Sequence, residues 1–135
     1  MEVATSGEKI NDQKEDIIIV GGGICGLATA LALHRKGIKS VVLERSKTVR
    51  ATGAAIIIQA NGWRALDQLG VSSKLRHTTV PIQKMAQYIA LDSGECKQVP
   101  LGDGEMRCLR RVDLMHALAD DLPLNTIRFG CKMLY

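Results

Sequence analysis

The glycine pattern Gly21-x-Gly23-x-x-Gly26 constrains the fold of this chain more than any other feature. It directly follows the apolar run IIIV, and a second apolar run further along the chain ends at Glu44. Such a pattern is weak by itself, but its place between two strands and at the start of a helix makes it specific. The sequence therefore predicts a strand–turn–helix–strand unit over residues 16–45 that binds a dinucleotide.

Each glycine of the pattern has a physical purpose. Gly21 lets the chain turn sharply off the strand, and Gly23 lacks a Cβ, so that a pyrophosphate can approach the backbone. Gly26 allows the following helix, predicted over residues 24–36, to lie close to the sheet. A tight turn that only packs a helix on a sheet is the alternative, and the acid at the end of the second strand favours the dinucleotide.

The ends of the predicted helix and of the second strand supply the other candidate ligand contacts. Ile24 and Cys25 begin the helix, where free N–H groups and the positive end of the helix dipole suit a phosphate. For the Cys25 side chain we expect a small buried residue rather than a redox centre. Glu44 can accept a hydrogen bond from a ribose 2′-hydroxyl and would repel a 2′-phosphate. NADP is therefore disfavoured at this half-site, while FAD and NAD both remain open.

The composition disfavours several other classes of protein. The 135 residues suffice for one domain. The net charge of +4 comes from scattered basic residues, and one Trp, two Tyr and one Phe offer no stacking platform, so nucleic-acid binding is disfavoured. The four cysteines have no CxxC spacing and no histidine at ligand spacing beside them, which predicts free thiols and no metal site.

The sequence also indicates where the protein is located and where its domain begins and ends. No apolar run approaches the ~20 residues of a membrane-spanning helix, and the N-terminus lacks the pattern of a secretory signal. We therefore expect an intracellular, cytoplasmic protein without a transmembrane segment. Residues 1–15 are polar and are predicted to be a disordered tail, and residues 16–135 are predicted to form a partial dinucleotide-binding domain.

Beyond the glycine unit, the hydrophobic pattern predicts further strands and helices. A helix is expected to start after Asn61, to bury Trp63 and to stop at Gly70. The remaining predicted elements are strands at 54–58, 106–109 and 126–129, a short helical turn at 72–77, a hairpin over 84–99 and a helix over 112–122.

Three further segments carry a resemblance to a known family. They read RATGAA from Arg50, NGWRAL from Asn61 and RRVDLMHAL from Arg110. Together with residues 16–45 they resemble the plant FAD-dependent monooxygenases, which belong with the aromatic-ring hydroxylases and are similar to zeaxanthin epoxidase and urate hydroxylase. The resemblance runs from residue 16 almost to the end of the chain and matches the N-terminal third of such proteins.

The resemblance implies an α/β fold, namely a Rossmann-like βαβ FAD-binding half with a small antiparallel strand excursion, truncated relative to the family. It implies that Glu44 binds the adenosine ribose, Arg45 flanks the adenine and Arg111 contacts FAD, while the three glycines hold the pyrophosphate. Family members use NAD(P)H to reduce the flavin, which uses O₂ to hydroxylate or epoxidise a small organic substrate. The residues that would choose that substrate are mostly absent, so the substrate is unknown.

Two departures from the family limit what this chain is expected to do alone. Ile57 stands in a segment where the family usually has a glycine. The Asp-Gly and Gly-Asp motifs that the family uses downstream for the flavin and the nicotinamide are missing, and Gly102-Asp103-Gly104 is interpreted as a turn. We therefore expect negligible monooxygenase activity from this chain alone. A truncated, non-catalytic nucleotide-binding remnant and an NAD-binding Rossmann module are the alternatives.

The resemblance also bears on stability. In the family, later strands complete the sheet beside the first strand. An unpaired edge at that strand predicts marginal stability and self-association, because free backbone groups there can pair with another chain.

Overall fold

A computed structural model describes residues 3–4, 17–49, 53, 55–89, 91–100 and 104–133. The chain divides into two compact units, which we describe separately: the first unit comprises Met1–Ala54 and Arg111–Tyr135, and the second unit comprises Ala55–Arg110. The structure confirms the predicted α/β class, with a parallel sheet and a small antiparallel one. Most of the predicted tail and the expected turn at Gly102-Asp103 lie outside the described residues.

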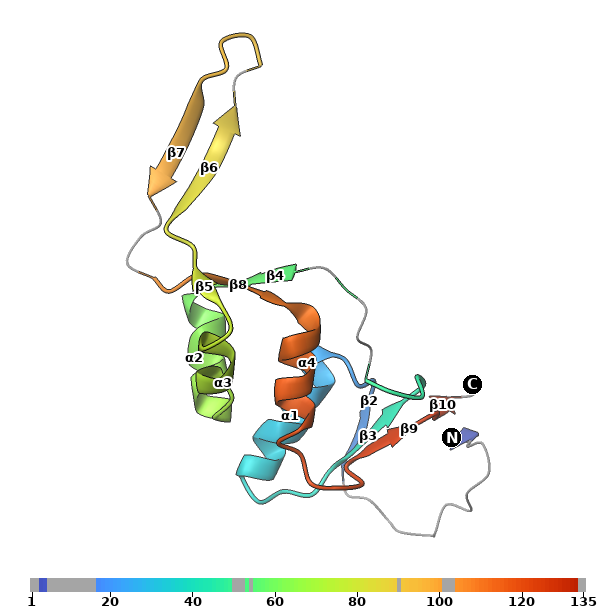
Figure 1. The fold of residues 1–135 in the computed structure, drawn as a ribbon. Helices are drawn as coiled ribbons and strands as arrows, with labels where there is room; N and C mark the ends of the chain where they lie inside the picture. Colours follow the sequence, from blue (N-terminus) through green and yellow to red (C-terminus); the bar gives the residue numbers. More distant parts are fainter. Residues whose placement is uncertain are drawn as a thin grey trace. The chain divides into compact units, whose positions relative to one another are not determined.

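The first unit is built on a three-stranded parallel sheet (Figure 1). Its strands are β2 (Ile18–Val20), β3 (Val41–Glu44) and β9 (Ile127–Phe129), in the order β2-β3-β9. Helix α1 (Ile24–Arg35) connects β2 to β3 and packs against both strands. Helix α4 (Arg111–Ala119) packs against α1. The predicted strand–turn–helix–strand unit is therefore confirmed.

The periodicity of α1 explains which of its faces packs against the sheet. Leu27, Ala30 and Leu31 are fully buried, and their i, i+3, i+4 spacing places them on one face of the helix. Gly37, with a φ of +73°, follows the helix as the predicted C-terminal stop. All four residues of β3 are buried because this strand is the central one of the sheet.

A short antiparallel pair completes the first unit. Strand β1 (Val3–Ala4) pairs with β10 (Lys132–Met133), so that Val3 lies opposite Met133. These two N-terminal residues fall within the stretch predicted to be disordered, and here they form a strand instead. Neither β1 nor β10 was among the predicted elements.

The second unit contains an antiparallel sheet of β4 (Ala55–Ile58), β8 (Arg107–Arg110) and β5 (Val80–Pro81), in the order β4-β8-β5. A separate hairpin of β6 (Lys84–Ile89) and β7 (Cys96–Pro100) matches the hairpin predicted over 84–99. Strand β5 is too short to have been predicted from alternation.

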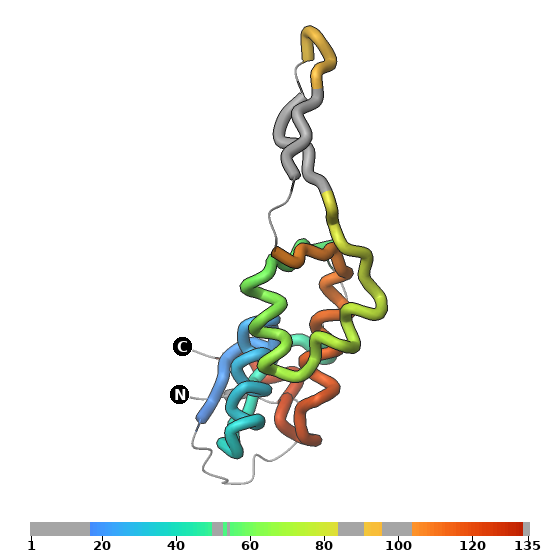
Figure 2. Tube along the Cα trace, turned by 90° about the vertical axis from the view of Figure 1, so that its left-hand side faces the viewer, coloured from blue at the N-terminus to red at the C-terminus, as the bar shows by residue number. Residues whose placement is uncertain are grey.

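Two helices pack against each other in the second unit, α2 (Ala60–Leu69) and α3 (Ser72–Arg76) (Figure 2). The predicted start of α2 after Asn61 is wrong by two residues, because Gln59 has the extended backbone of an N-cap and the helix begins at Ala60. The predicted stop is confirmed, since Gly70 adopts a φ of +75°.

The core of the second unit centres on Trp63, which is 1% exposed, as predicted. Its indole N–H donates a hydrogen bond to the carbonyl of Ile58, at 3.1 Å. The guanidinium of Arg76 lies 5.0 Å from the centre of the Trp63 ring. The same guanidinium pairs with Asp67 at 2.6 Å and with Glu105 at 2.8 Å, so one side chain joins three segments of this unit.

Candidate functional site

The glycine turn lies at the carboxyl end of β2. Gly21 has a φ of +100°, a conformation that favours glycine over residues with a Cβ. Its N–H donates a hydrogen bond to the carbonyl of Leu43, at 2.8 Å, which ties the turn to β3. The sharp turn that the sequence predicted at Gly21 is therefore present.

Gly23 and Gly26 serve different purposes. A Cβ at Gly26 would lie 1.9 Å from the carbonyl oxygen of Gly21, so the close packing of α1 on the turn requires glycine. A Cβ at Gly23 would meet nothing within 4 Å. Gly23 is also the N-cap of α1 and makes no side-chain capping bond. The first N–H groups of α1 have no carbonyl partner within the helix. They follow directly after Gly23, beside this open space.

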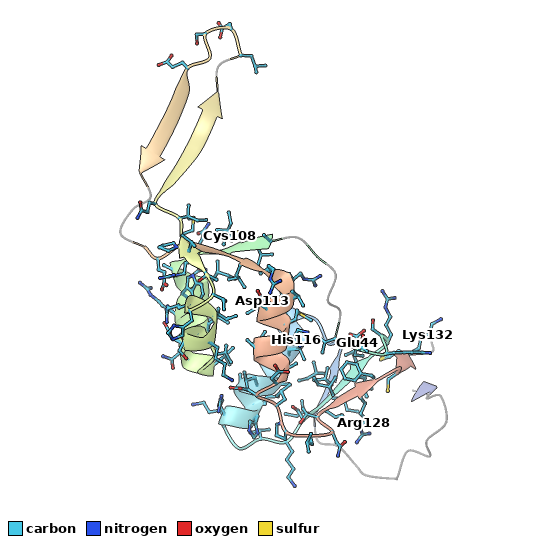
Figure 3. All side chains as sticks on the ribbon, in the orientation of Figure 1. Glu44, Cys108, Asp113, His116, Arg128 and Lys132 are labelled. Atoms are coloured by element: carbon cyan, nitrogen blue, oxygen red, sulfur yellow. The ribbon has the colours of Figure 1, made fainter. Side chains whose placement is uncertain are left out.

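Glu44 lies next to this turn, at the end of β3 (Figure 3). It is only 9% exposed. Its Oε2 accepts a hydrogen bond from the N–H of Gly22 at 2.6 Å, and its Oε1 accepts one from the N–H of Ser46 at 2.8 Å. The carboxylate is therefore held in place by the backbone on both sides.

The turn and the end of β3 form part of an open cleft of about 480 Å³, which lies entirely within the first unit. Its charged lining residues are one acid, Glu44, and three cations. The cleft is lined by Val20, Gly21, Gly22, Gly23, Leu43, Glu44, Arg45, Arg111, Met115, Cys131, Lys132 and Met133. An excess of positive charge around a helix N-terminus suits an anionic ligand.

Arg111 is the first residue of α4, where the helix dipole opposes a positive charge. Gly53 lies directly against it: a Cβ at Gly53 would be 3.0 Å from the Cδ of Arg111. Gly53 also has a φ of +152°, which favours glycine. An anion bound in the cleft would offset the unfavourable position of the Arg111 charge.

The structure brings most of the predicted site residues together. Gly21, Gly23, Glu44, Arg45 and Arg111 all line the cleft. The other three, Ile24, Cys25 and Gly26, occupy the first turn of α1 beside it, without lining it.

The expectation that Cys25 is buried is wrong, because the side chain is exposed. The buried face of α1 is set by Leu27, Ala30 and Leu31. Cys25 lies about 200° around the helix from Leu27, at about 100° per residue. Cys25 lies in the first turn of α1, as predicted, but its side chain faces away from the core.

Sequence reasoning missed the wall of the cleft formed by Cys131, Lys132 and Met133. The N–H of Cys131 donates to the carbonyl of Glu44 at 2.9 Å, and the N–H of Gly130 donates to the carbonyl of Ser46 at 3.0 Å. These bonds place the segment beside the end of β3. The only local signal for this bend is Gly130, whose φ is +73°.

A larger hollow of about 780 Å³ lies at the other end of the same sheet, where β3 begins. His34, Lys39, Val41 and Asn125 are among its lining residues. It contains neither the glycine turn nor the N-terminus of a helix, so we assign the candidate site to the smaller cleft.

Neither a metal site nor a membrane-spanning helix is found among the described residues. In that part of the chain, we find no group of three or more His, Cys, Asp or Glu side chains arranged to hold a metal ion. Among the same residues, no helix is long and apolar enough to cross a membrane.

Comparisons with known proteins agree with this geometry. The family model described as FAD binding domain matches residues 14–126. Monooxygenase 1 of Arabidopsis thaliana is 56% identical over 115 residues, which cover 84% of this chain and 29% of that protein. Monooxygenase 2 of the same plant is 44% identical over 123 residues, covering 89% and 30%. The chain thus spans only 29–30% of the length of these two relatives.

Among solved structures, 2-methyl-3-hydroxypyridine-5-carboxylic acid oxygenase superposes with a TM-score of 0.76 over 87% of this chain and 32% of that chain. The sequences are 24% identical in this comparison, so the likeness concerns the fold alone.

Proposed function

The chain belongs to the FAD-binding-domain family, and from this premise we propose that it binds FAD through the adenosine diphosphate half of the cofactor. One observation carries the proposal: the glycine turn, the N-terminus of α1, a buried acid and three cations all meet at one cleft. The open space beside Gly23 fits a pyrophosphate, because a Cβ there would contact nothing.

The phosphates would be held by backbone N–H groups and by cations. The N–H groups at the start of α1, from Ile24 and Cys25, have no carbonyl partner within the helix. Arg111 would add a charge-assisted hydrogen bond, and Arg45 would flank the adenine. Bound FAD supplies the redox and oxygen chemistry. The residues of this chain bind the cofactor and orient it.

Glu44 would recognise the ribose. Its carboxylate lies beside the glycine turn, where it accepts hydrogen bonds from the N–H groups of Gly22 and Ser46. A carboxylate at this position would accept a hydrogen bond from a ribose hydroxyl, whereas a 2′-phosphate would be repelled by its negative charge. This favours FAD or NAD over NADP in the cleft.

For the whole protein we propose a wider role, with this chain as its FAD-binding portion. Two of its relatives are named monooxygenases. We propose an NAD(P)H- and O₂-dependent hydroxylation or epoxidation of a small organic substrate. These 135 residues contain neither of the family's downstream motifs for the flavin and the nicotinamide. We therefore expect them to have negligible monooxygenase activity alone.

Calorimetric titration of the purified chain with FAD, ADP, FMN and NADH tests the proposal. We expect FAD and ADP to bind with similar affinity, and FMN, which lacks the adenosine half, not to bind. Weak binding of FAD and ADP, or none, would support the truncated, non-catalytic remnant. Binding of NADH without FAD would support the NAD-binding module. Oxygen uptake with NADH and added FAD measures the expected lack of activity.

A further inference from the structure

We propose that Glu44 is a positioning residue that braces the glycine turn before any ligand binds, in addition to contacting the ribose. The brace concerns the unliganded chain. Its effect on affinity rests on the proposed function.

The carboxylate of Glu44 is held between two backbone donors. The Gly22 N–H lies 2.6 Å from Oε2 on the side of the glycine turn, and the Ser46 N–H lies 2.8 Å from Oε1 beyond the end of β3. Hydrogen bonds to an ionised acceptor are about twice as strong as neutral ones. Because Glu44 is 9% exposed, water competes weakly for these bonds.

Backbone hydrogen bonds extend the brace across the cleft. Gly21 donates to the carbonyl of Leu43, while Cys131 donates to the carbonyl of Glu44 and Gly130 to that of Ser46. The short stretch from Leu43 to Ser46 therefore connects the glycine turn on one side with residues 130–131 on the other. The carboxylate adds a side-chain connection to this set, directed at the turn.

Gly22 fits closely against the brace. A Cβ at Gly22 would lie 3.1 Å from the Cβ of Glu44 and 3.2 Å from its Oε2, closer than ordinary van der Waals contact. The glycine pattern leaves this position unspecified. In this chain Glu44 constrains it. Gly23, one residue later, has open space where its Cβ would be, and so offers a matched control.

A braced turn has its ligand-binding shape in advance. Binding then does not require the turn to become ordered, which reduces the free-energy cost of association. Loss of the brace should weaken every ligand that uses the turn, including one without ribose hydroxyls. This consequence separates a brace from a simple contact to the ribose.

The first test measures amide hydrogen exchange by NMR in the full chain without ligand. Glu44→Gln replaces one acceptor oxygen with an NH₂ group that faces a backbone N–H. We expect at least one of the Gly22 and Ser46 amides, the one that then faces the NH₂ group, to exchange about tenfold faster or more in this variant. Gly22→Ala should have the same effect at Gly22, and it remains informative if Glu44→Gln does not fold. Gly23→Ala should leave exchange at both amides unchanged. Unchanged exchange in Glu44→Gln and Gly22→Ala would overturn the proposal.

The second test titrates wild type and Glu44→Gln with ADP and with 2′,3′-dideoxy-ADP. A brace predicts that the substitution weakens both ligands about tenfold or more. If only the affinity for ADP falls, Glu44 is a ribose contact alone and the proposal fails. If the wild-type chain binds neither ligand, the proposed function fails, and the exchange measurement still decides the brace.

Discussion

The two units of the chain use charged side chains for different purposes. In the first unit Glu44 is held by backbone N–H groups, and Arg45 and Arg111 line a cleft. In the second unit Arg76 pairs with both Asp67 and Glu105, so its charge joins segments of the fold. The cations Arg45 and Arg111 of the first unit thus surround space for a ligand, whereas the charge of Arg76 fastens the second unit. Substitutions should divide accordingly into effects on binding and effects on stability.

Glycines show a related contrast. The Cβ that alanine would add at Gly26 in the first unit meets a backbone carbonyl oxygen at 1.9 Å. The Cβ that alanine would add at Gly62 in the second unit meets the Cγ2 atom of Ile58 at 2.7 Å. A side-chain methyl group can move by rotation or small shifts, but a backbone oxygen that belongs to a tight turn cannot.

Alanine substitutions at these two glycines test the contrast. Gly26→Ala should lower the free energy of unfolding by about 3 kcal/mol or more, because α1 must separate from the turn. Gly62→Ala should change it by about 1 kcal/mol or less, since the gain in helix propensity within α2 offsets the shift of Ile58. Urea denaturation followed by circular dichroism measures both. If both variants lose the same free energy of unfolding, the distinction between Gly26 and Gly62 is wrong.

Paired arginine substitutions test the division between binding and stability. Arg111→Gln in the first unit should weaken the binding of FAD and ADP about 10- to 100-fold. This change in affinity corresponds to the free energy that a hydrogen bond to a charged group usually contributes. It should leave the unfolding midpoint nearly unchanged. Arg107→Gln in the second unit removes a 2.7 Å pair with Glu105 and a bond to the carbonyl of Thr79. It should lower the thermal midpoint without changing affinity. Calorimetry measures the affinity of each variant, and thermal unfolding measures its midpoint. A lower midpoint in Arg111→Gln, or a weaker affinity in Arg107→Gln, would contradict this division.

Self-association, predicted from the sequence, remains a prediction and belongs to the first unit. Within the described residues, β2 pairs with β3 alone, and Ile18 and Val20 on β2 are 53% and 58% exposed. We expect sedimentation velocity to show association that increases with concentration and is reduced by Ile18→Lys. Val80→Lys, at an exposed position of β5 in the second unit, is the control and should not reduce it. A monomer at all concentrations would contradict the prediction.

A smaller effect is expected on the stability of the second unit at low pH. Hydrogen bonding to Arg76 lowers the pKa of Asp67 from 3.8 to about 2, and Arg76 also lowers the pKa of Glu105. A carboxyl group whose pKa is lowered by folding stabilises the fold above its unfolded pKa, and this contribution is lost as the pH falls through the folded value. The second unit should therefore lose stability between about pH 4 and pH 2.

The acid effect should be small because these side chains are partly exposed and salt screens them. Thermal unfolding at decreasing pH measures it. Asp67→Asn should reduce the loss on acidification, and a pH profile identical to that of the wild type would show that the pair contributes nothing.

Local rules explain why the glycine turn, α1 and Gly37 could be predicted from sequence. A positive φ, a helical period and a helix stop each depend on neighbours within a few residues. The acid at position 44 was also found, because the spacing from turn to second strand is nearly fixed in a βαβ unit.

The features that could not be predicted depend on contacts between residues that are far apart in the sequence. Nothing near Arg76 in the sequence indicates its pairing with Glu105, 29 residues away. The bond from Gly22 to Glu44 spans 22 residues and appears only once the fold is known. Cys131 and Lys132 line the cleft because backbone hydrogen bonds hold their segment beside the end of β3. No sequence motif indicates this contact. The exposure of Cys25 likewise follows from which face of α1 packs.

The pairing of β3 with β9 places Val42 opposite Ile127, with the whole second unit between them in the sequence. The chain must close a long loop before these strands meet, and such non-local pairings slow folding. During synthesis from the N-terminus, the glycine turn emerges before the second unit, but the wall at residues 131–133 emerges after it. A nucleotide can therefore meet a complete cleft only after the whole second unit has been synthesised. Recovery of ADP binding during refolding should lag behind formation of the helices.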